Sequence, residues 1–272
     1  MRGGMLSSST KTDPTWNQPL GDTELIRDAK GMTTERQTLT DLYLKYYPDK
    51  LPELETLVQE HGYAKLIDEA NALVDFLRSC GASYNATTSK ISPPGALVNK
   101  GITDVSPLAS LTSLKKLDLH ENEIVDVSHL ETLTSLTYLD LHDNQIVDVS
   151  HLETLISLEL LLLARNQIRD VSPLATLTSL TDLSLSENQI VDVSPLATLT
   201  SLTYLDLDTN QIVDVSPLAT LTALTELDLD GNQIADVSPL ATLTSLKELH
   251  LQGNQIVDKT SLNHLRGDIY WD

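Results

Sequence analysis

From residue 97 onward, aliphatic side chains recur in one fixed pattern. Near the start of each copy, leucines such as Leu205 and Leu207 alternate with polar residues, which predicts a short strand with one buried face. An asparagine follows each strand and recurs every 22 residues, at Asn122, Asn144, Asn166, Asn188, Asn210, Asn232 and Asn254. A degenerate copy over 97–111, with Lys100 at the asparagine position, precedes these seven. The pattern therefore predicts about eight copies of one structural unit.

Strands 22 residues apart are too close in sequence for anything but a short crossover, and they are expected to be parallel. Ser216 and Pro217 predict an N-cap followed by proline at the first helical position, and Leu218 and Leu221 lie three apart, which favours a short 3-10 helix. The asparagine is expected to satisfy backbone groups where the strand ends. Each unit is then one coil of a solenoid, stable only when stacked on its neighbours.

These leucines and asparagines, with the Ile-x-Asp-Val-Ser-Pro-Leu segments between Ile102 and Leu262, resemble the 22-residue class of leucine-rich repeats. That class occurs in bacterial internalins and in the leucine-rich regulatory subunit of protein phosphatase 1. The resemblance covers about two-thirds of the chain and implies an α/β fold. The expected fold is a curved, right-handed leucine-rich-repeat solenoid with a parallel concave sheet and a convex side of short 3-10 turns.

The segment before the repeats has a different pattern. Apolar residues at helical spacing, bounded by Pro52, Gly62 and Gly81, predict three short helices between about residues 34 and 81. We expect residues 31–84 to form a small helical cap on the first coil, since a solenoid must cover its end. An independent binding domain is the alternative.

The remaining boundaries follow from composition and from the repeat register. Residues 1–30 are rich in small and polar residues and are expected to be disordered, whereas residues 85–272 form the predicted solenoid. Lys259 replaces the buried valine of the pattern and Asp268 replaces the next leucine, so the register is expected to end there in a degenerate C-terminal cap. Residues 269–271 are expected to fold over the last coil.

Solvent-facing strand positions of successive coils should stack into columns on the concave sheet, with strands about 4.8 Å apart. The first column contains Lys116, Tyr138, Leu160, Asp182, Tyr204, Glu226 and Glu248. The second contains Asp118, Asp140, Leu162, Ser184, Asp206, Asp228 and His250. The third contains His120, His142, Ala164, Ser186, Asp208, Asp230 and Gln252.

Two departures from the pattern predict a binding site. Leu160 and Leu162 are apolar where polar residues are expected, with Tyr138 and Tyr204 on either side, and carboxylates gather beyond them. We predict a partner-binding site that combines an apolar anchor with an acidic half; the alternative is repeat drift, in which the leucines only cover the next coil. The predicted site residues are Tyr138, Asp140, His142, Leu160, Leu162, Asp182, Tyr204, Asp206, Asp208, Glu226, Asp228 and Asp230.

Two sets of side chains resemble metal ligands. His120 and His142 lie near Asp118 and Asp140, so a zinc-dependent function is a remote alternative. Duplication of neighbouring repeats explains the same residues, and we predict no metal and no cofactor. A column of aspartates recurs every 22 residues and is expected to accept backbone N–H bonds at the turn into the helical segment rather than to bind calcium: Asp104, Asp126, Asp148, Asp170, Asp192, Asp214, Asp236 and Asp258.

Composition narrows the partner. The formal charge of −21 and the pI near 4.5 argue against nucleic acid and anionic membranes, and favour a protein partner with a basic and partly apolar surface. Cys80 is the only cysteine, and no apolar run indicates a signal peptide or a membrane span, so we expect a cytoplasmic protein or one exported without a Sec-type signal.

No motif of an enzyme is present in the sequence. We predict a protein–protein interaction scaffold that binds on its concave face. A regulatory subunit of an enzyme such as a phosphatase, and a secreted effector or adhesin, are the open variants.

Overall fold

The computed structural model describes residues 39–42, 44–45, 54–85 and 89–271, in two compact units, Met1–Ala72 and Leu73–Asp272. The first unit contains helical residues 39–42 and 44–45, helix α2 (Leu54–His61) and the start of α3 (Tyr63–Ser79), with Gly62 at φ 79° between the last two. Three helical segments therefore lie where the apolar spacing predicted them. Residues 1–30 lie outside the described residues, and the predicted boundaries at 30 and 84 stay predictions.

The second unit begins with the end of α3 and a small antiparallel hairpin. Gly81, at φ 71°, ends the helix, and strands β1 (Ser83–Asn85) and β2 (Lys90–Ser92) pair with each other. Tyr84 is buried, and its hydroxyl lies 2.9 Å from the Ser113 hydroxyl in the first coils. The hairpin is thus fixed to the coils that follow it.

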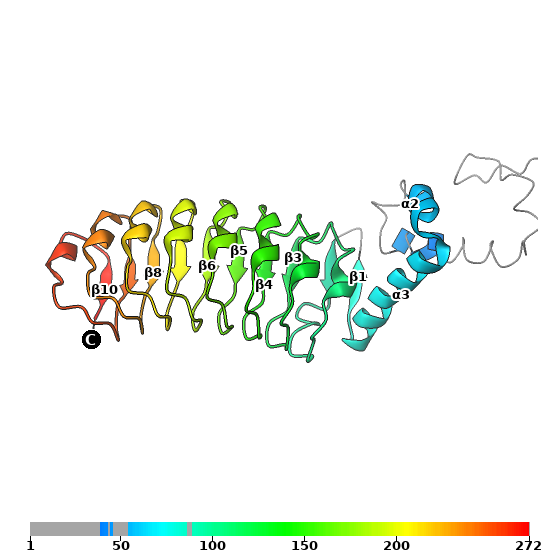
Figure 1. Cartoon of the computed structure of the whole chain (residues 1–272), viewed down its shortest axis with the longest axis horizontal. Coiled ribbons are helices and arrows are strands. Elements are labelled where there is room, and N and C mark those ends of the chain that lie inside the picture. Colours follow the sequence, from blue (N-terminus) through cyan, green and yellow to red (C-terminus); the bar gives the residue numbers. More distant parts are fainter. Residues whose placement is uncertain (1–38, 43, 46–53, 86–88, 272) are drawn as a thin grey trace, which may run out of the picture. The chain divides into compact units, whose positions relative to one another are not determined.

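Eight parallel strands form one sheet along the coils, in the order β10-β9-β8-β7-β6-β5-β4-β3 (Figure 1). Each strand contributes three residues: β3 (Lys116–Asp118), β4 (Tyr138–Asp140), β5 (Leu160–Leu162), β6 (Asp182–Ser184), β7 (Tyr204–Asp206), β8 (Glu226–Asp228), β9 (Glu248–His250) and β10 (Asp268–Tyr270). The central residue of each strand from β3 to β9 is buried, as alternation requires. This is the leucine-rich-repeat solenoid expected from the sequence.

Short 3-10 helices form the opposite side of the coils (Figure 1): η2 (Ser106–Leu108), η3 (Ser128–Leu130), η4 (Ser150–Thr154), η5 (Ser172–Thr176), η6 (Ser194–Thr198), η7 (Ser216–Thr220), η8 (Ser238–Thr242) and η9 (Thr260–Leu262). A threonine hydroxyl joins each of these turns to the one before, as when Thr198 donates to the Ala175 carbonyl at 2.8 Å. In the last coil His264 occupies this position, with Nε2 2.9 Å from the Ala241 carbonyl. Fully buried leucines and isoleucines fill the space between the two sides.

The recurring asparagine links neighbouring coils through its amide. Asn166 is 7% exposed; its Oδ1 accepts the Ile146 N–H at 2.9 Å, and its Nδ2 donates to the carbonyls of Leu141 and Leu163. The same set of contacts recurs at every asparagine from Asn122 to Asn254. The predicted role of these asparagines is confirmed.

The start of each 3-10 helix differs from the prediction in one respect. Ser216 is not the N-cap: Val215 occupies that position, and no side chain hydrogen-bonds there as a cap. Instead the carboxylate of Asp214 accepts the Ser216 N–H at 2.8 Å, and this bond and the Ser216 hydroxyl lower the Asp214 pKa. The aspartate column does accept these N–H bonds, as predicted. Each aspartate lies two residues before the serine, and its carboxylate accepts the N–H of that serine.

The last coil corrects a second prediction. Asp268 does not replace a buried leucine, because the coil is two residues shorter: Asp268 pairs with Glu248 and Ile269 with Leu249. The repeat register thus continues to Tyr270, whose ring stacks on His250 with centroids 4.4 Å apart. Gly267 makes the shortening possible, since a Cβ there would lie 2.5 Å from the Leu246 carbonyl oxygen.

Candidate functional site

The strand register places the predicted columns side by side on the outward face of the sheet. Tyr138 lies beside Leu160, Leu160 beside Asp182, and Asp182 beside Tyr204. In the second column Leu162 lies between Asp140 and Ser184. Leu160 is therefore the direct neighbour of Tyr138, Leu162 lies two residues further along the same strand beside Asp140, and one strand separates Tyr204 from Leu160.

The apolar part of this face is partly exposed. Leu161 points into the core and is 0% exposed, while Leu160, Leu162 and Tyr138 are half-buried. The Tyr138 hydroxyl donates to Asp140 at 3.3 Å, and burial, with the charges of Asp140 and Asp118, raises the Tyr138 pKa to about 12. Tyr138 therefore offers an aromatic surface and a neutral hydroxyl at physiological pH.

Histidines and carboxylates border the apolar part. The rings of His120 and His142 stack with centroids 4.4 Å apart, and their Nδ1 atoms lie 2.6 Å from Asp118 and 2.7 Å from Asp140. Donor atoms of His120, Asp140 and His142 lie within 4.8 Å of one another, the proximity that a metal ion requires. Since a carboxylate already pairs with each Nδ1, these contacts account for the cluster as a hydrogen-bonded network.

The acidic half lies on strands β7 and β8. Asp206 and Asp228 are register neighbours, and the Ser184 hydroxyl donates to Asp206 at 2.8 Å. Burial, with the charges of Asp206, Glu226, Asp228 and Asp182, raises the Tyr204 pKa to about 12. Within the residues that the structure describes, no Lys or Arg pairs with Asp206, Asp208, Glu226 or Asp228. A partner's cation would therefore meet uncompensated negative charge.

The pKa of Asp228 reflects its burial and the carboxylates close to it. Burial raises its pKa to about 6, the Asp230 N–H bond opposes that shift, and the charges of Asp230 and Asp206 add to it. Because the pKa of Asp228 in the folded protein lies above the ordinary 3.8, protonation of this carboxyl stabilises the fold. The contribution is fully present below pH 3.8 and is lost as the pH rises through 6.

We predict that Asp228→Asn stabilises the protein at pH 7.5 and not at pH 3.5. Because water still screens part of the carboxylate, the gain in the free energy of unfolding should be about 1 kcal/mol. Urea denaturation at both pH values measures it. Asp214→Asn is the matched control with the opposite sign, since the Asp214 pKa is lowered. A gain for Asp228→Asn that is equal at both pH values would contradict the assignment.

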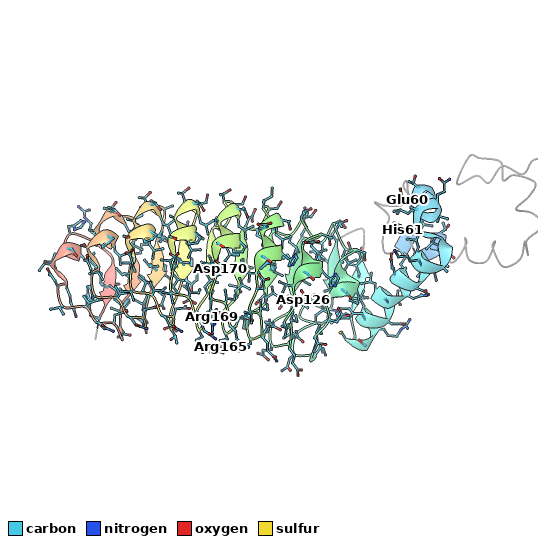
Figure 2. The ribbon with its side chains drawn as sticks, in the orientation of Figure 1. Glu60, His61, Asp126, Arg165, Arg169 and Asp170 are labelled. Carbon is cyan, nitrogen blue, oxygen red and sulfur yellow. The ribbon has the colours of Figure 1, made fainter. Side chains whose placement is uncertain are left out.

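The cations of the turns are already paired. Arg165 and Arg169 follow the end of strand β5 (Figure 2), and Arg165 lies 2.7 Å from Glu187 and 3.4 Å from Asp143. Arg169 donates to the Gln189 side chain at 2.7 and 2.9 Å. The side chains of both arginines are therefore bound to neighbouring turns of the same solenoid.

Sequence reasoning missed two features. One is a row of valines that directly follow the isoleucines of the repeat and are all at least 51% exposed: Val125, Val147, Val191, Val213 and Val257. These valines share one position of the 22-residue repeat, which has Arg169 and Ala235 in two other coils, but the adjacent Ile and Val are distinguished only once the turn geometry is known. The other is a hollow beside β3 lined by Lys90, Lys115 and Lys116. Its signal was the unusual Pro93-Pro94-Gly95 sequence in the degenerate first coil.

Two further predictions concern the rest of the chain. The side chain of Cys80 is buried and forms no disulfide, as expected for a lone cysteine. Among the described residues, no helix combines the length and the apolar character that crossing a membrane requires.

Comparisons with known proteins agree with this geometry. The family profile described as "Leucine Rich repeats (2 copies)" matches residues 112–154, 134–176, 178–220 and 222–267, together more than half of the chain. The chain belongs to the leucine-rich-repeat family. This family, and the similar structures described next, support a protein–protein interaction scaffold. No curated protein sequence matches the chain.

Its repeats resemble those of the internalins. Internalin C2 (inlC2) from Listeria monocytogenes is 38% identical with a TM-score of 0.64, and the match covers 74% of this chain and 91% of that one. Internalin inlF from the same organism is also 38% identical, with a TM-score of 0.60, over 64% of this chain and 54% of that one. The chain thus spans about half the length of inlF. The plant peptide hormone receptor RGFR1, solved in complex with RGF2, shares the fold at 22% identity, with a TM-score of 0.54 over 62% of this chain and 29% of that one.

Proposed function

We propose that the outward face of the sheet, from β4 to β8, binds one partner protein. The observation that carries the proposal is the pair Leu160 and Leu162, which are apolar at outward positions where the repeat otherwise places polar residues. Partly exposed leucines beside an aromatic ring resemble the centre of a protein interface. Tyr138, next to Leu160, supplies that ring.

The charge of the face selects the partner. Six carboxylates lie on the strands and turns around Tyr204 and beyond it toward the C-terminal end: Asp182, Asp206, Asp208, Glu226, Asp228 and Asp230. A basic partner surface would relieve their mutual repulsion and speed association, and both effects weaken as salt screens the charges. The partner that fits has an apolar patch next to a cluster of Lys or Arg.

Of the two open variants, the similarity to two bacterial internalins favours a bacterial effector or adhesin over a regulatory subunit of an enzyme. The very uniform repeats support the same variant. Asp140 and His142 lie at the border of the apolar part, where they would contact the rim of either kind of partner.

We expect Leu160→Ser/Leu162→Ser to abolish capture of the partner. The tagged full chain is incubated with lysates of candidate host and producing cells, and captured proteins are identified by mass spectrometry. Because the two side chains form the apolar centre, their loss should weaken binding at least 100-fold, about 2.7 kcal/mol. Both leucines are only half-buried, so the variant should fold, which circular dichroism checks.

Val191→Ser/Val213→Ser is the matched control, since it removes two exposed apolar side chains from the turns instead of from the sheet. A partner captured by wild type and by the valine variant, but not by the leucine variant, supports the proposal. Equal capture by the leucine variant would refute it, and loss confined to the valine variant would move the interface to the valine row.

A further inference from the structure

The sheet ends at β3 because the first coil cannot provide a strand. From β4 to β9, the three residues 22 positions before each strand themselves form the neighbouring strand. Pro94, Gly95 and Ala96, which lie 22 positions before β3, form a turn instead. Proline lacks the N–H that a ladder needs. Among the described residues, the backbone–backbone hydrogen bonds between this coil and the next begin at Asn99, whose N–H donates to the His120 carbonyl at 3.2 Å. In the described part of the chain, β3 is therefore paired on one edge only, with β4.

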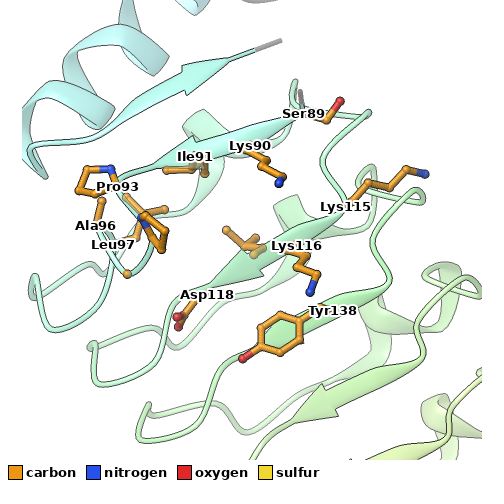
Figure 3. A pocket seen from close by; sticks show the side chains of 13 residues that line it. Ser89, Lys90, Ile91, Pro93, Ala96, Leu97, Lys115, Lys116, Asp118 and Tyr138 are labelled. Carbon is orange, nitrogen blue, oxygen red and sulfur yellow. The ribbon is translucent and has the colours of Figure 1, made fainter. Parts of the chain in front are cut away.

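A hollow of about 460 Å³ lies at this free edge (Figure 3). Strand β2 borders it on one side, and β3 with Tyr138 borders it on the other; among the residues that the structure describes, β2 pairs with β1 alone. Ile91, Pro93 and Leu97 contribute apolar surface. The hollow thus combines unpaired backbone groups of a strand with an apolar wall, the two features that an added strand uses.

The charge at this hollow is opposite to that of the rest of the solenoid. Lys90, Lys115 and Lys116 line it and are all exposed, and no carboxylate of the described residues lies within ion-pair distance of them. Residues 89–272 contain nine Lys and Arg residues, including these three: Lys90, Lys100, Lys115, Lys116, Arg165, Arg169, Lys247, Lys259 and Arg266.

One third of these cations thus surround one hollow. The single carboxylate of its lining, Asp118, is already hydrogen-bonded to His120 at 2.6 Å. Figure 3 shows Lys90 extending from β2 toward β3, and Lys116 extending toward Tyr138, whose ring centre lies 5.6 Å from the Lys116 ammonium. The site is therefore built for a negatively charged occupant.

We propose that an extended segment of a partner protein, with alternating apolar and acidic residues, adds as a strand to the free edge of β3. Its backbone pairs with β3, its apolar side chains fill the space beside Ile91 and Leu97, and its carboxylates contact Lys90, Lys115 and Lys116. This site is separate from the acidic half of the sheet face and does not depend on the function proposed for that face.

The test uses capped pentapeptides with Glu at positions 1, 3 and 5 and Val, Ile, Leu, Phe or Tyr at positions 2 and 4, titrated into the full chain and followed by backbone NMR. We expect at least one peptide to bind with a Kd below about 1 mM and to shift the amide signals of Lys116 and Asp118. Lys90→Glu should weaken that binding at least fivefold. Lys247→Glu, an exposed lysine elsewhere in the solenoid, should leave it unchanged.

Three results would overturn the proposal. They are equal binding of the same peptides with Lys in place of Glu, no binding of any peptide in this range, and undiminished binding of a peptide whose backbone nitrogens are methylated, because that peptide cannot pair as a strand. Leu160→Ser/Leu162→Ser should bind the peptides like wild type, which separates this site from the one on the sheet face.

Discussion

Replacing Asn166 by alanine should destabilise the solenoid by about 3 kcal/mol, more than any substitution on its outward face. The Ile146 N–H has the Asn166 Oδ1 as its acceptor at 2.9 Å, and it would be buried without a partner. The Leu141 and Leu163 carbonyls would suffer less, because Asn144 and Asn188 also donate to them. One orphaned donor and the lost bonds to the Leu141 and Leu163 carbonyls account for the expected loss.

Urea denaturation followed by circular dichroism measures this effect. Gln167→Ala, one residue away on an exposed position, is the matched control and should change the stability by less than about 0.5 kcal/mol. Asn166→Asp tests the direction of the bonds: its carboxylate can still accept from Ile146, but it faces two carbonyl oxygens and should be as harmful as alanine at pH 7. A stable Asn166→Ala protein would show that the ladder of asparagines is dispensable.

Gly267→Ala should detach the last strand from the sheet. A Cβ at this position would lie 2.5 Å from the Leu246 carbonyl oxygen and 2.7 Å from that of Lys247, and backbone atoms cannot move aside as a flexible side chain can. The Asp268 N–H bond to Lys247 and the Leu251 N–H bond to Tyr270 would then break. We expect a loss of about 2 kcal/mol, confined to the C-terminal coil.

Hydrogen exchange locates the effect, since the Leu251 amide should lose its protection while the Leu161 amide keeps it. Arg266→Ala changes the adjacent, exposed residue and should leave both amides protected. If Gly267→Ala left the Leu251 amide as protected as in wild type, the shortened last coil would have to tolerate the extra carbon by a backbone shift.

The sequence predicted what repeats, and it was weaker on what does not repeat. Strand positions, outward columns and the asparagine contacts follow from a 22-residue period, because one correct coil determines the others. The serine cap was wrong since Ser and Asp both accept N–H bonds at helix starts, and only the geometry shows that Asp214 and its equivalents do so. The last coil was misplaced because a two-residue deletion before Asp268 leaves no periodic trace.

The candidate site was predictable to a similar degree. Leu160 and Leu162 were conspicuous because each breaks a column of polar residues, and the register places Leu160 beside Tyr138 and Leu162 beside Asp140. The hollow at β3 could not be predicted in this way, since it arises where the first coil lacks a strand and where Lys90 from one segment meets Lys115 and Lys116 from another. Its recognition required the three-dimensional position of a residue pair, Lys90 and Lys116, that no period connects.

Every asparagine hydrogen bond between coils spans 20 to 25 residues and none reaches beyond an adjacent coil. A genetic event that deletes or duplicates 22 residues within the uniform repeats therefore joins equivalent positions and recreates the same contacts. The separation between the lysine-lined hollow at β3 and the acidic strands β7 and β8 would change in steps of about 4.8 Å, one strand at a time. Unequal recombination could thus match the distance between these two surfaces to the size of a partner, and every intermediate sequence would still encode a protein that folds.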